Sequence, residues 1–239
     1  METTYQDVTC ILVISIVFFA ILAKCTGVKF DHPATYHTTD DSNSDVNLQL
    51  YRTAVGLFED EDYEAAAATA RLVSSEDLLL NLEASKLIAV CDYKSGNYDL
   101  AIDEMQQGLQ LIATFENPDA PELRMFKLAF LSFLAEIYLD QGNDELAWRM
   151  LHEAQPFAEI EDAANQDPLF RKGSLGMIHH NLAILYERSH QWSLAANHYG
   201  LAYQIWQEFP DCEQRCKACH AGYMTCGENA LRQMYQGLD

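Results

Sequence analysis

The residues of this sequence that could do chemistry gather near its C-terminal end. Cys216, Cys219 and His220 spell C-x-x-C-H, the spacing by which c-type haem is attached to a polypeptide. Two thiols three residues apart can form thioethers with the haem vinyl groups, and the adjacent imidazole can ligate the iron. The motif therefore raises one alternative function, an electron carrier with covalently bound haem.

Zinc is a second chemistry that these side chains could support, because Cys212 would add a third thiolate to the C-x-x-C-H set. Zinc ligands usually come from two separate elements, and one unbroken helix gathers four of them poorly. Disulfide bonds would need an oxidising compartment, and the seven cysteines of the chain would leave one unpaired. Haem, zinc and disulfide bonds all stay open as alternatives.

The same cysteines also fit the packing face of a helix. Small or apolar residues recur there at steps of three and four: Cys212, Cys216, Cys219, Tyr223, Cys226 and Ala230. Free cysteine packs as a small hydrophobe, and this spacing is typical of one side of a helix. The pattern favours a cysteine-rich capping helix in residues 210–239, and we expect no bound cofactor.

Other catalytic patterns are absent from the sequence. It contains no Gly-rich phosphate loop, no G-x-S-x-G and no H-E-x-x-H. His179 and His180 are consecutive on an expected helix, where neighbouring side chains point about 100° apart and share a metal poorly. We therefore expect a protein that is not an enzyme.

The stretch before the cysteines, Ser174–Phe209, has the spacing of two short amphipathic helices joined near Ser189–Gln191. Large and small apolar residues alternate along a stripe of each helix: Leu182, Ala183 and Tyr186, then Trp192, Ala195, Tyr199 and Ala202. Neither helix alone can hide its stripe from water. The stripes must therefore be covered by neighbouring helices.

This order of residues resembles the tetratricopeptide repeat (TPR) family. Earlier copies have turns at Ser95–Asn97 and Gln141–Asn143, and the first copy, around Tyr63, is degenerate. The resemblance implies an all-α fold: a right-handed TPR-type α-solenoid of about four helix pairs in residues 47–209, closed by the C-terminal capping helix.

The period of the copies is uneven. It is 35 residues from Tyr63 to Tyr98, 46 from there to Asp144, and 48 from there to Trp192. The family's usual period is about 34 residues. The later copies are therefore expected to have longer helices.

The N-terminal segment predicts attachment to a membrane. After the polar residues 1–7, Val8–Ala23 runs for 16 residues without a charged side chain. A span needs roughly 17–25 such residues, a length that is reached if Lys24 extends to the interface. We expect residues 8–24 to be a single-pass transmembrane anchor, with a cleaved signal sequence as the alternative. Residues 25–46 lack apolar periodicity and are expected to be a flexible linker.

The charges beside this segment indicate an orientation. Lys24 and Lys29 follow it, whereas only acidic residues precede it. This bias would keep the repeats on the cytoplasmic or matrix side. An anchor followed by repeats resembles organelle import receptors and respiratory-complex assembly factors, so a mitochondrial membrane is the expected location.

The chain carries a formal charge of −21, from 36 acidic and 15 basic residues. This charge opposes nucleic-acid binding and favours a protein or peptide partner, such as a basic segment or helix. The TPR resemblance implies a partner groove lined by the first helix of each pair. Its candidate residues are Tyr51, Phe58, Lys86, Tyr93, Lys94, Glu136, His180, Ile184, Glu187 and Arg188.

Taken together, these patterns predict a non-catalytic, membrane-anchored scaffold or adaptor for protein–protein interactions. The roles that fit this description are a receptor, an assembly factor and an accessory subunit of an organellar membrane complex.

Overall fold

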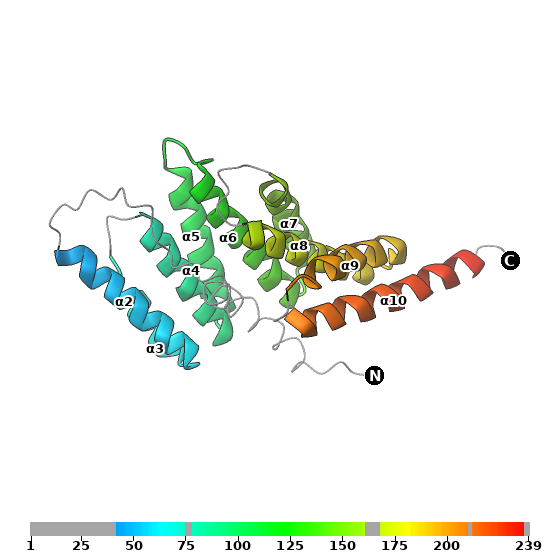
Figure 1. The fold of residues 1–239 in the computed structure, drawn as a ribbon, viewed down its shortest axis with the longest axis horizontal. Helices are drawn as coiled ribbons and strands as arrows, with labels where there is room; N and C mark the ends of the chain where they lie inside the picture. Colours follow the sequence, from blue (N-terminus) through cyan, green and yellow to red (C-terminus); the bar gives the residue numbers. More distant parts are fainter. Residues whose placement is uncertain (1–41, 75–77, 161–167, 210–211, 237–239) are drawn as a thin grey trace. The chain divides into compact units, whose positions relative to one another are not determined.

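The computed structural model describes residues 42–74, 78–160, 168–209 and 212–236, and these ranges are helical with no strand (Figure 1). The predicted all-α class is confirmed. In chain order the helices are α2 (Ser42–Glu59), α3 (Tyr63–Ala70), α4 (Leu78–Lys94), α5 (Tyr98–Ala113), α6 (Pro121–Asp140), α7 (Asp144–Glu159), α8 (Pro168–Arg188), α9 (Trp192–Trp206) and α10 (Glu213–Gln236).

The N-terminal predictions fall mostly outside these ranges. The polar residues 1–7, the anchor or signal sequence 8–24 and the linker as far as residue 41 are not among the described residues. Helix α2 begins at Ser42, a few residues before the predicted start of the array at residue 47. Of the helices that the structure describes, none combines the length and apolar character needed to cross a membrane.

Four turns share one backbone geometry; they join α2 to α3, α4 to α5, α6 to α7 and α8 to α9. Each turn holds one residue in the left-handed region: Glu61 (φ 63°), Gly96 (φ 79°), Gly142 (φ 72°) and His190 (φ 57°). The N–H of that residue donates to the carbonyl three residues earlier. The next N–H donates to the carbonyl five residues earlier, as in the 2.8 Å bond from Asn97 to Asp92. This pair of bonds is the Schellman ending of a helix.

The residue after each left-handed position is the N-cap of the next helix. Oδ1 of Asp62 accepts a 3.2 Å hydrogen bond from the N–H of Ala65, and Oδ1 of Asn143 accepts one of the same length from Leu146. Such bonds satisfy donors that a helix start leaves unpaired. One turn therefore both ends the first helix of a pair and begins the second.

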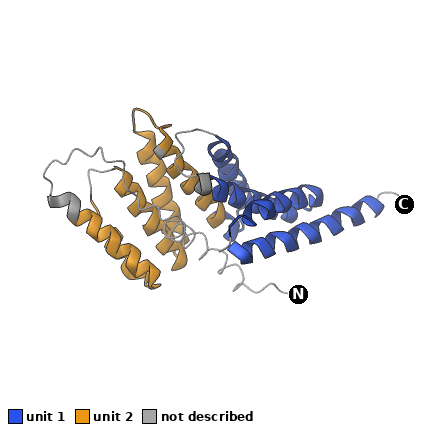
Figure 2. Cartoon of the chain, in the orientation of Figure 1, with its two compact units in different colours: residues 1–30, 138–239 blue, residues 31–137 orange. Residues whose placement is uncertain are grey.

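Residues 31–137 form one compact unit (Figure 2). Within it α2 packs on α3, α3 on α4, and α4 on α5. Alanines at the helix contacts are fully buried, among them Ala54, Ala66 and Ala101. Gly108 of α5 shows how close the packing is, because a Cβ at this position would lie 2.5 Å from the ring of Phe130. Small residues are thus what lets these helices approach one another.

The second compact unit includes residues 138–239 (Figure 2). Here α7 packs on α8, α8 on α9, and α9 on α10. Its core joins Tyr199, Ala202 and Trp206 of α9 to Cys212, Cys219 and Cys226. Helix α10 therefore packs onto α9, with its cysteines in the shared core.

The face by which α10 packs differs from the predicted one. Cys212, Cys219 and Cys226 are fully buried as expected, but Cys216 is only half-buried and Tyr223 is 45% exposed. Arg215 is buried instead, with its guanidinium 5.0 Å from the centre of the Trp206 ring. The packing face is rotated because the long stem of an arginine can cover an aromatic surface, which an apolar pattern does not register.

Candidate functional site

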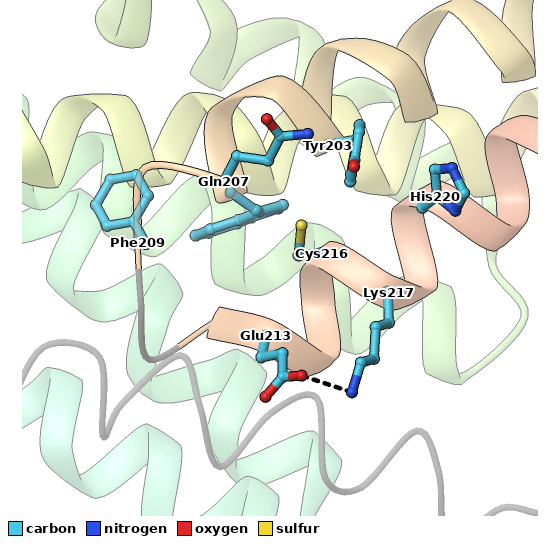
Figure 3. Close-up of a pocket in the computed structure, with 8 residues that line it drawn as sticks. Tyr203, Gln207, Phe209, Glu213, Cys216, Lys217 and His220 are labelled. Carbon is cyan, nitrogen blue, oxygen red and sulfur yellow. Dashed lines mark ion pairs between the residues drawn. The ribbon is translucent and has the colours of Figure 1, made fainter.

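A shallow cleft of about 380 Å³ lies between α9 and α10 and contains part of the C-x-x-C-H motif (Figure 3). Cys216 and His220 line it from α10, opposite Tyr203, Trp206 and Gln207 of α9. An ion pair of 2.7 Å joins Lys217 to Glu213 beside the cleft. The lysine lowers the pKa of that carboxyl, and burial together with Glu213 raises the pKa of the Cys216 thiol.

Cys219 faces the core and not the cleft. Its Sγ lies 3.3 Å from Nδ1 of His180 on α8. Burial raises the pKa of this thiol to about 12 and lowers the pKa of His180 to about 4. Both groups are therefore neutral at pH 7. A nucleophilic cysteine needs the opposite shift, toward thiolate.

The residues of the motif do not fit a covalent haem. Attachment needs both thiols on one accessible surface, but Cys216 borders the cleft while Cys219 is fully buried against α8. Zinc fits no better, since no group of three or more His, Cys, Asp and Glu side chains in the described part of the chain is placed to hold a metal. The five cysteines in that part carry free thiols.

Two of the predicted groove residues in the unit 31–137 contact one carboxylate. Glu83 accepts a 3.1 Å hydrogen bond from Oη of Tyr51 and forms a 2.6 Å ion pair with Lys86. The Lys86 ammonium also lies 5.6 Å from the centre of the Phe126 ring. Burial and the nearby Glu83 raise the pKa of Tyr51. Lys94, one helical turn past Val90, is partly buried at the end of α4.

Three other residues predicted for the groove are packing residues. Phe58, Tyr93 and Glu136 are each less than 9% exposed. The Tyr93 ring has edge contacts with Tyr98 and Phe133, both at 5.4 Å between centres. These side chains therefore offer little surface to a partner, and their place in a groove stays a prediction. Counting residues along a helix shows which side chains share a face. It does not show how closely the next helix covers that face.

The predicted groove residues of the other unit all lie on α8. His180 is partly buried and contacts Cys219, and Glu187 accepts a 2.7 Å hydrogen bond from Oη of Tyr199. Arg188 pairs with Asp144 at 2.5 Å and donates to the carbonyl of Leu139 at 3.1 Å. Its side chain is still 42% exposed. Ile184 is partly buried against the core cluster.

A row of imidazole and aromatic rings was missed by the sequence patterns. It consists of His152 and Trp148 on α7, Tyr186 and His179 on α8, and His198 on α9. The ring centres of Tyr186 and His198 are stacked at 5.2 Å, and the Nδ1 atoms of His179 and His198 are 3.1 Å apart. Burial and His198 lower the pKa of His179 to about 4. The only signal in the sequence was Tyr186 in its repeat position, because the other members belong to three separate helices.

The chain matches no protein-family model, and a search of curated proteins found no match either. In the part of the chain that the structure describes, fold and site define an all-helical protein with a recurring turn, in which burial keeps several thiols and imidazoles neutral.

Proposed function

We propose that the chain is a non-catalytic scaffold of the TPR kind, a right-handed solenoid of four helix pairs that α10 caps. The observation that carries the proposal is the turn geometry that recurs in all four pairs, with one left-handed residue followed by an N-cap. Within each compact unit, helices pack on their neighbours in sequence, as in stacked repeats. Such arrays serve mainly as surfaces for other polypeptides.

The neutral thiols and imidazoles support a binding role over catalysis. Burial raises the pKa of Cys91 and Cys219 to about 12 and that of Cys226 to about 11. Burial also lowers the pKa of His179 and His180 to about 4. The pKa of a catalytic thiol or imidazole is usually shifted so that the group is reactive near neutral pH. The pKa shifts of these groups have the opposite direction.

The partner surface that we propose consists of the predicted groove residues that keep some exposure. They are Tyr51, Lys86 and Lys94 in one unit, and His180, Ile184, Glu187 and Arg188 in the other. The chain's charge of −21 favours a partner with a basic segment or helix. Electrostatic attraction of this kind weakens with salt.

The partner test starts from the tagged full-length chain, purified in mild detergent with whatever accompanies it. The partner is then purified and its affinity measured for matched variants. Glu187→Gln removes a charge but keeps an acceptor for Tyr199, and we expect binding about three to tenfold weaker at low salt. Glu145→Gln makes the same change on α7, a second helix, and should bind as the unaltered chain does. If Glu187→Gln and Glu145→Gln weakened binding equally, the groove would not be the binding surface. If no partner accompanied the purified chain, the scaffold role would be contradicted.

We also propose that residues 8–24 anchor the protein in a membrane, with a mitochondrial membrane as the expected one. The uncharged run Val8–Ala23 supports this. After alkaline carbonate extraction, the full chain should stay with the membrane pellet and a chain lacking residues 2–24 should be released. The intact mass of the mature protein distinguishes an anchor from a cleaved signal sequence, because cleavage would lower the mass by that of the removed segment. Release of the uncleaved full chain would contradict the anchor.

A further inference from the structure

From Tyr223 to its end, α10 has an apolar face that the described residues leave largely uncovered. Five large side chains lie on it, each 45–70% exposed: Tyr223, Met224, Leu231, Met234 and Tyr235. Their spacing of three, four and seven residues places them on one side of the helix. The packing against α9 ends at Cys226, the last buried residue of α10, and Figure 1 shows the helix running on past α9.

Gly227 makes a notch in the middle of this face. Glycine weakens a helix interior, and it leaves a gap on the helix surface where another side chain can pack. At the other glycines near this helix a side chain does so: a Cβ on Gly222 would lie 2.7 Å from the Tyr199 ring, and a Cβ on Gly200 would lie 3.3 Å from Tyr223. At Gly227 nothing lies within 4 Å. The gap at this glycine is therefore left open by the described residues of the chain.

Charge indicates what can cover the face. The chain as a whole carries −21, so most pairs of its surfaces repel each other. In contrast, α10 contains two acidic residues, Glu213 and Glu228, and three basic ones, Arg215, Lys217 and Arg232. Two copies of this helix can approach without the repulsion that the rest of the molecule would meet. Glu228 and Arg232 border the apolar face and are already paired at 3.7 Å.

We propose that α10 covers this face with a second copy of itself, in an antiparallel pair whose two-fold axis passes near Asn229. In that register Leu231 of each copy enters the notch at Gly227 of the other. Met224 then faces Met234, and Tyr223 faces Tyr235. Glu228 comes within reach of the second copy's Arg232. A two-fold interface must be complementary to itself, and a bulky residue opposite a notch meets that condition. The contact is short, so we expect a dissociation constant in the micromolar range.

The test is sedimentation equilibrium of the full-length chain in density-matched detergent, at about 1 to 100 µM, a range chosen to bracket a micromolar constant. We expect a monomer–dimer equilibrium. Leu231→Glu should weaken it about tenfold or more, whereas Gln233→Glu, the same new charge on the far side of the helix, should leave it within about twofold. Gly227→Leu fills the notch and favours the helix, so its dimer should weaken while its thermal stability is kept.

Two results would overturn the proposal. One is a monomer throughout the concentration range, which would mean that a different partner or none covers the face. The other is a dimer that both Leu231→Glu and Gly227→Leu leave intact, because its interface would then lie elsewhere. The partner assay for Glu187→Gln reports on the scaffold role separately, so either proposal can fail without the other.

Discussion

Cys219 and His180 lie within hydrogen-bond reach of each other and still form no catalytic pair. A reactive thiol–imidazole pair exchanges a proton to give thiolate and imidazolium. Burial opposes both charges here, raising the pKa of the thiol and lowering that of the imidazole. The nearby Arg215 disfavours an imidazolium further. Distance alone therefore does not identify chemistry, and the environment decides what two side chains can do.

The buried histidines predict a loss of stability in acid. In the unfolded chain a histidine titrates near 6.5, but in the folded protein the pKa of His179 and His180 is about 4. Because the unfolded state binds more protons, this stability is fully present above about pH 6.5 and is lost as the pH falls toward 4. For the partly buried His180 the loss is on the order of 3 kcal/mol. Urea unfolding midpoints measured from pH 7 to pH 4.5 would show it.

Variants assign that pH dependence to particular residues. His180→Gln should lower stability at pH 7, because it disturbs the contact with Cys219, and should flatten the decline between pH 6.5 and 4.5. His152→Gln removes an exposed histidine and should leave the slope as it is. If the unaltered chain and both variants lose stability equally as the pH falls, acid acts through the carboxylates and the prediction fails.

Glycines in the helices predict opposite effects of one substitution. Replacing a helical glycine with alanine usually stabilises a protein by about 0.5–1 kcal/mol. We expect that gain for Gly56→Ala, since nothing lies within 4 Å of the added Cβ. Gly108→Ala should instead cost about 1–3 kcal/mol, because its Cβ would lie 2.5 Å from the fully buried ring of Phe130. Chemical denaturation of the two variants tests both signs, and a gain at Gly108 would contradict the packing described.

At the scale of elements, the turns show what could be predicted from the sequence. The sequence predicts turns at Ser95–Asn97 and at Gln141–Asn143. In these turns Gly96 and Gly142 take left-handed φ. The helices around them followed from apolar spacing alone. The first and last copies lack this signal, because Glu61 and His190 hold the left-handed position where glycine would be expected. In these two turns the geometry follows from the helices on either side and not from the residue type.

This difference between turns predicts stability changes. A residue with a Cβ pays about 1 kcal/mol or more in the left-handed conformation. Glu61→Gly should therefore raise the free energy of unfolding by up to about 1 kcal/mol, and Gly142→Ala should lower it by about as much. Differential denaturation against the unaltered chain measures both changes. A loss in the glycine variant would mean that the exposed Glu61 side chain contributes more than its backbone costs.

The helix faces were predicted less well than the helices themselves. Cys212, Cys219 and Cys226 pack as a spacing of seven implies, yet Tyr223 is exposed and Arg215 is buried. Similarly, Tyr93 and Glu136 belong to a face that was predicted to be open but is closed by packing. Spacing fixes which residues share a side of a helix. How far that side is rotated, and how closely it is covered, depends on neighbours distant in sequence, such as Phe133 for Tyr93.

For the whole molecule, the proposed role of α10 as the cap of the array yields the last prediction. Trp206 and Tyr199 on α9 share a buried cluster with Cys219 and Cys226 of this helix and with Cys212 just before it. A chain that ends after Phe209 uncovers both rings, at a cost of roughly 4 kcal/mol or more, and should melt at least roughly 10 °C lower. A chain that ends after Glu228 keeps all three cysteines and should melt within a few degrees of the full protein. Stacked hairpins stabilise mainly their neighbours, so amide hydrogen exchange in the shorter chain should quicken in α8 and α9 well before α2 to α5. Equal melting of the two truncated chains, or uniform loss of protection, would show that α10 does not close the array.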